Sequence, residues 1–224
     1  MIISRGRKYV FVHIPKTGGN IPKTGGTALT LALEARAMRD DILVGDTPKA
    51  RARRARIKGD PASAHLRKHS PLSDLSGVLT PDQMDSFFIF TLVRNPWDRL
   101  VSYYHWLRAQ GFDHPAVHLA KATDFSAFLH DPATQAAQLA WPARAYMADS
   151  AGRARASAYV RIEHMQTDLA PIEAHLGFTL HPLPHHNVSA RARDWRGYYT
   201  DADAALIARL CATDIAAFDY HFDP

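Results

Sequence analysis

The feature that most constrains the fold of this chain is a strand that continues through a glycine-rich turn into a helix. The sequence contains this turn twice. An apolar strand at 9–14 enters Pro15-Lys16-Thr17-Gly18-Gly19-Asn20, and Ile21-Pro22-Lys23-Thr24-Gly25-Gly26-Thr27 follows at once. Glycines permit positive φ angles and close approach of the backbone to an anion, while a helix start and a lysine favour negative charge. The segment therefore predicts a phosphate-binding turn.

The order of residues in this turn disfavours the commonest class of nucleotide-binding loop. In the ATP- and GTP-binding loop G-x-x-x-x-G-K-[ST], lysine follows the glycines. Here lysine precedes them in both copies. The turn is therefore not expected to belong to a kinase or a GTPase.

A second junction between a strand and a helix lies at 87–104. The apolar run 87–93 ends at Arg94, Asn95 is a good N-cap, and Pro96 suits the first helical position. Ser102 comes two helical turns after Asn95 on the same face, so we expect Arg94 and Ser102 to reach one ligand group together. An arginine and a hydroxyl are a suitable pair for a phosphate.

Both junctions resemble motifs of the sulfotransferases that use 3′-phosphoadenosine 5′-phosphosulfate (PAPS). Pro-Lys-Thr-Gly-Gly-Thr is similar to the family's 5′-phosphosulfate loop, and Val-Arg-Asn-Pro-Trp-Asp-Arg-Leu-Val-Ser-Tyr-Tyr at 93–104 is similar to its 3′-phosphate motif. The resemblance extends over nearly the whole chain and is to small bacterial members related to the heparan-sulfate 2-O-type carbohydrate enzymes. It implies sulfuryl transfer from PAPS to a hydroxyl of a carbohydrate or small-molecule acceptor, with no metal.

The duplicated turn departs from the family, whose members carry one such loop. Because the second copy adjoins the helix expected at 27–38, we assign donor binding to Lys23, Thr24, Gly25, Gly26 and Thr27. Two alternatives remain open: the first copy from Lys16 to Gly19 holds the donor, or the duplication leaves a donor-nucleotide-binding protein with impaired catalysis. Loop insertions cost little chain entropy, so the fold is expected in each case.

Sulfuryl transfer needs a base for the acceptor hydroxyl, and histidine titrates closest to neutral pH. The chain has 13 histidines, so the candidate base must be chosen by its position in the sequence. The stretch 64–75 resembles the segment that carries the base in heparan-sulfate 2-O-type enzymes, which favours His69 and leaves His65 as a second candidate. His13, inside the first strand, is expected to be packed or hydrogen-bonded. His69 would then take the acceptor proton while Lys23 stabilises charge on the leaving phosphate.

The length and composition fit one domain over 1–224. With 224 residues and 46% hydrophobic residues, the chain can bury a full core. We expect an α/β fold, a three-layer P-loop-like domain with a mostly parallel central sheet flanked by helices. Another strand is expected at 158–162, and helices at 163–175 and from Thr200 through Ile215.

A basic run at 49–58 is expected to be an exposed helix or loop, and the alternative is a patch for an anionic acceptor. It contains Lys49, Arg51, Arg53, Arg54, Arg56 and Lys58. Nucleic acid is not an expected partner, because base stacking would need aromatic residues that the run lacks.

No apolar stretch is long enough for a membrane span and no leader is visible, so we expect a cytoplasmic enzyme. The oligomeric state is not predicted.

Overall fold

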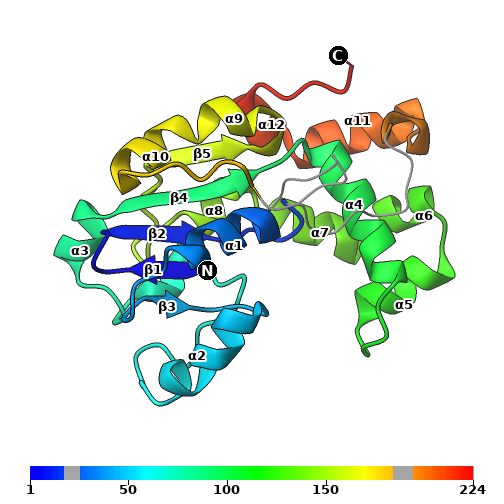
Figure 1. Cartoon of the computed structure of the whole chain (residues 1–224). Helices are drawn as coiled ribbons and strands as arrows, with labels where there is room; N and C mark the ends of the chain where they lie inside the picture. Colours follow the sequence, from blue (N-terminus) through cyan, green and yellow to red (C-terminus); the bar gives the residue numbers. More distant parts are fainter. Residues whose placement is uncertain (18–25, 184–193, 224) are drawn as a thin grey trace.

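A five-stranded sheet forms the centre of the molecule in the computed structural model, which describes residues 1–17, 26–183 and 194–223 (Figure 1). The strand order is β3-β1-β2-β4-β5. The strands are β1 (Ile2–Ser4), β2 (Tyr9–Val12), β3 (Ile42–Leu43), β4 (Phe88–Val93) and β5 (Ala158–Arg161). Strands β2, β4 and β5 are parallel, whereas β1 pairs antiparallel with both β2 and β3.

The expectation of a mostly parallel sheet is confirmed for β2, β4 and β5 and is wrong for the edge formed by β1 and β3. Residues 5–8 alone separate β1 from β2, and Lys8 takes a φ of 51° in this turn. A connection this short can close only an antiparallel hairpin, since a parallel crossover needs a dozen or more residues. The sheet is therefore mixed, and the α/β class stands.

Apolar residues of the strands alternate between two separate cores, one on each face of the sheet. Val10, Val12 and Ile89 belong to one core, which includes Leu100 of helix α4 (Pro96–Arg108). Tyr9, Phe11 and Phe90 belong to the other, together with Leu29 and Leu33 of helix α1 (Gly26–Ala35). Because side chains of a strand alternate in direction, both faces of the parallel strands are covered.

The remaining helices cover these faces and the ends of the sheet. They are α2 (Pro48–Lys58), α3 (Pro81–Ser86), α5 (Pro115–Ala122), α6 (Phe125–His130), α7 (Pro132–Ala140), α8 (Ala143–Tyr146), α9 (Met165–Asp168), α10 (Ala170–Leu176), α11 (Asp201–Leu210) and α12 (Ala212–Phe218). The helix expected at 163–175 is interrupted before α10, which has Pro171 in its first turn. In the described ranges, no helix combines the length and apolarity that a bilayer crossing requires.

Local chemistry explains the helices that matter most for the site. The Asn95 side chain accepts a hydrogen bond from the Trp97 amide at 3.1 Å and so caps α4, as expected. Thr200 and Asp203 form a capping box at the start of α11. The basic run forms α2, in which only Ala50 is buried, so the interpretation as an exposed helix is confirmed.

Candidate active site

The two junctions identified in the sequence lie side by side because β2 and β4 are neighbouring parallel strands. Val12 is paired with Thr91, and the Thr91 hydroxyl donates a hydrogen bond to the Val12 carbonyl at 2.8 Å. Both strands therefore end at the same edge of the sheet. The turn after β2 and Arg94 after β4 meet there, at the edge where open α/β sheets bind ligands.

The first residues of the first copy of the turn, which follow β2, have a defined conformation. Lys16 adopts a φ of 61°, in the left-handed region. The hydroxyl of Thr17, which is buried, donates to the Ile14 carbonyl at 2.9 Å. Of the residues assigned to the donor, Lys23, Thr24 and Gly25 lie outside the described residues, as do Gly18 and Gly19 of the first copy.

The second copy supplies the start of α1, at Gly26. This glycine packs against His13 at the end of β2, because a Cβ atom at this position would collide with Nε2 of the His13 ring. Thr27 follows in the first turn and is half-buried. The start of α1, supplied by the second copy, thus adjoins His13 at the end of β2, the strand that leads into the first copy.

Positive charge is concentrated around Lys16. Its Nζ atom lies 4.4 Å from the centre of the Trp106 ring, and its carbonyl accepts a hydrogen bond of 3.4 Å from Nη1 of Arg94. Burial lowers the pKa of Lys16 to about 7, and the charges of Arg94 and Lys68 act in the same direction. An anionic ligand would relieve this repulsion, so these residues fit a phosphate-bearing donor.

Arg94 is held by an acidic partner in the first turn of α4. Its side chain is fully buried, and Nε and Nη2 donate to Oδ2 of Asp98 at 2.8 and 2.5 Å. Ser102 is half-buried farther along α4, and no hydrogen bond joins it to Arg94 among the described residues. The structure therefore brings Arg94 to Lys16 and Asp98, and joint binding of one ligand group by Arg94 and Ser102 stays a prediction.

His69 lies at the same end of β2. Its Nδ1 atom is 2.8 Å from the backbone carbonyl of His13, and the two rings meet edge to face at 5.0 Å. A carbonyl can only accept, so Nδ1 carries the proton and Nε2 keeps its lone pair. Burial lowers the pKa of His69 to about 4, and the positive charge of Lys68 contributes. His69 is thus a neutral imidazole at physiological pH, with Nε2 able to accept a proton.

The other two histidines considered in the sequence are placed differently. His65 is exposed, and its Nε2 is engaged with the Asp74 carbonyl at 2.8 Å. His13 is buried as expected, and its Nδ1 has no hydrogen-bond partner among the described residues. Burial holds the pKa of His13 well below its usual range. His13 therefore serves the site through its carbonyl group and its packing against Gly26.

Glu163 stabilises the turn between β4 and α4, a role that sequence analysis missed. Its Oε1 accepts a hydrogen bond of 2.8 Å from the Asn95 amide, and its Oε2 accepts one of 3.3 Å from the Tyr220 hydroxyl. Burial raises the pKa of Glu163. No local pattern links these positions, because the contact depends on the pairing of β4 with β5. Sequence analysis also missed the contact of Trp106 with Lys16, because this contact depends on the pairing of β2 with β4.

Comparison with known proteins agrees with this arrangement. The model of a family described as the sulfotransferase family matches residues 1–221. No match to a curated protein was found. The family match covers nearly the whole chain and includes both junctions, which confirms the family predicted from the two motifs. The chain therefore belongs to the sulfotransferase family.

Proposed function

We propose that the protein transfers the sulfuryl group of PAPS to a hydroxyl group of a carbohydrate or small-molecule acceptor. The observation that carries this proposal is the hydrogen bond from Arg94 to the Lys16 carbonyl, which joins the segments that follow the neighbouring parallel strands β4 and β2. His69 is bonded to His13, directly after β2. These residues supply cations for a phosphate-bearing donor and a neutral base for an acceptor. Family membership supports sulfuryl transfer as the reaction.

Lys16 is the proposed donor lysine, in preference to Lys23. It lies beside Arg94, and the helix start at Gly26 and Thr27 completes a donor cradle from the second copy of the turn. Lysine and the N–H groups of a helix start both stabilise negative charge that builds on a leaving phosphate. Arg94 contributes charge to the same region, and an entering phosphate would share its guanidinium with Asp98.

His69 is the proposed general base. Nε2 takes the proton from the acceptor hydroxyl as its oxygen forms the bond to sulfur, and the bond between sulfur and the phosphate oxygen breaks on the opposite side. The hydrogen bond from Nδ1 to the His13 carbonyl holds the ring in the required tautomer and orientation. The proposed chemistry relies on positioning and electrostatics and uses no metal.

Titration calorimetry tests the donor site before any acceptor is known. We expect 3′-phosphoadenosine 5′-phosphate (PAP) to bind without Mg²⁺, and ATP with Mg²⁺ not to bind. Labelled PAPS is then incubated with panels of hydroxylated saccharides and small molecules, with the His69→Ala variant as control. Absence of PAP binding would contradict the donor assignment, whereas PAP binding without transfer to any acceptor would contradict the catalytic part alone.

A further inference from the structure

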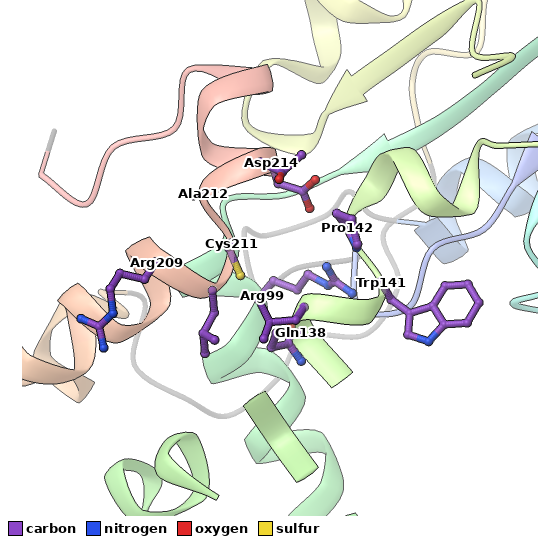
Figure 2. Close-up of a pocket in the computed structure, with 11 residues that line it drawn as sticks. Arg99, Gln138, Trp141, Pro142, Arg209, Cys211, Ala212 and Asp214 are labelled. Atoms are coloured by element: carbon purple, nitrogen blue, oxygen red, sulfur yellow. The ribbon is translucent and has the colours of Figure 1, made fainter. Parts of the chain in front are cut away.

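A pocket of about 110 Å³ is lined in part by Arg99 of α4 (Figure 2). The pocket lies between α4, the connection from α7 to α8, and the junction of α11 with α12. Its lining includes Arg99, Gln138, Leu139, Trp141, Cys211 and Asp214. None of these residues belongs to the donor site described above.

Besides the exposed Arg209, the pocket is lined by a second arginine, Arg99, in the first turn of α4. The side chain is half-buried, and in the described ranges it forms no hydrogen bond and no ion pair. Arg94, at the entrance to the same helix, is by contrast paired with Asp98. A guanidinium keeps its charge at all physiological pH values and presents five N–H donors in a planar fork. Arg99 thus offers donors that no described protein group uses.

The buried carboxylate of the pocket does not serve as its partner. Both oxygens of Asp214 accept from the Ala143 amide, at 2.9 and 3.1 Å, so this carboxylate faces the start of α8. Burial raises the pKa values of Asp214 and Tyr146, and the charge of Arg99 opposes both shifts. The charge of Arg99 therefore acts on both Asp214 and Tyr146, although Arg99 forms no ion pair with Asp214.

The rim of the pocket is apolar and aromatic. Trp141 is 43% exposed and Leu139 is 59% exposed, so both present apolar surface to solvent beside the pocket. The Trp141 ring also lies 5.1 Å from the ring of Tyr146, which supports it from the interior. Figure 2 shows the guanidinium of Arg99 extending from α4 toward Trp141 and Pro142. A cation within the pocket and an aromatic surface at its mouth suit a ligand with one charged end.

We propose that this pocket binds the carboxylate group of a small organic ligand whose aromatic or apolar part rests on Trp141 and Leu139. A planar carboxylate matches the fork of Arg99 through two parallel hydrogen bonds. A cavity of about 150 Å³ can hold benzene, so the smaller volume here admits the carboxylate and a few carbons. The rest of the ligand lies on the rim. This site does not depend on the identity of the sulfuryl donor.

Calorimetric and fluorescence titrations with benzoate test the proposal, because benzamide has nearly the same shape without the charge. We expect benzoate to bind to the intact chain, with tryptophan emission changing on binding, and benzamide to bind at least tenfold more weakly. Arg99→Gln should weaken benzoate binding at least tenfold. Arg54→Gln is the matched control: Arg54 is an exposed arginine of α2 that does not line the pocket, so its loss should leave affinity within twofold.

Equal binding of benzoate and benzamide, or unchanged benzoate affinity in Arg99→Gln, would overturn the proposal. If Arg99→Gln does not fold, as judged by circular dichroism, Trp141→Ala decides instead: weakened binding supports the site and unchanged binding rejects it. The titrations are repeated with saturating PAP and with Lys16→Ala. Benzoate binding that PAP abolishes would place benzoate in the donor site and reject the pocket, whereas failure of PAP to bind leaves the benzoate result standing.

Discussion

The Nδ1 atom of His69 lies 2.8 Å from the carbonyl oxygen of His13, across 56 positions of sequence. This contact attaches the loop with the candidate base to the end of β2, the strand that also leads into the donor turn. It requires the tautomer in which Nε2 is free of hydrogen. One strand end therefore orients the proposed base and positions the proposed donor lysine.

Replacement of His69 by alanine should abolish most turnover while donor binding persists. Loss of a general base lowers rates by about 10²- to 10⁴-fold, and we expect a fall in kcat of this size with PAP affinity unchanged. The measurement is the rate of transfer from labelled PAPS, together with PAP calorimetry. His65→Ala is the control, because His65 is exposed and bonded to Asp74. A larger rate loss in the control variant would move the base to His65.

The two lysines of the duplicated turn are distinguished by paired variants. Lys16→Ala should weaken PAP binding by about 1.5–3 kcal/mol, the scale of a hydrogen bond to a charged group. Lys23→Ala should change it by less than about 0.5 kcal/mol, as substitutions away from a site usually do. Calorimetry on both variants measures the difference. The reverse ranking would assign the donor to the second copy of the turn.

Donor binding should be coupled to protonation of Lys16. Its pKa is lowered to about 7 in the free protein, so a large fraction of the amine is neutral near that pH. An anion nearby favours the charged form and raises this pKa, so PAP binding should take up protons above pH 7 and weaken as the pH rises. Calorimetry at pH 8 in buffers of different ionisation enthalpy measures the uptake. Proton uptake that persists in Lys16→Ala would assign the effect to another group.

The ion pair of Arg94 with Asp98 should matter for stability. Because Arg94 is fully buried, Asp98→Ala removes a carboxylate that accepts two hydrogen bonds from a buried guanidinium. Removal of one partner from a buried pair costs about 3–5 kcal/mol, and urea unfolding should show a loss of this order. Asp113→Ala is the control, since its side chain is 97% exposed beside His118. An equal and small loss in both variants would mean that Asp98 does not compensate Arg94.

Most of the α/β fold could be predicted from local signals, and the misses have identifiable causes. The apolar runs of β2, β4 and β5 and the cap of α4 at Asn95 were visible in the sequence, because the signals lie within a few residues of the element. Strand β1, with only three residues at 2–4, is too short for a clear period. Strand β1 pairs with β2 on one side, through the hairpin, and with β3 on the other side. Both contacts depend on the folded sheet.

The sequence alone determined the two strand-to-helix junctions and the family, since glycines, caps and apolar runs act through neighbouring residues. The choice of His69 as the candidate base came from the resemblance of 64–75 and stays a prediction. Only the tertiary structure decided that Lys16 meets Arg94, that His69 donates to the His13 carbonyl, and that Arg99 is left without a described partner. Each of these depends on which strands and helices become neighbours. Such neighbours follow from burying apolar faces over the whole chain, and no local pattern encodes that outcome.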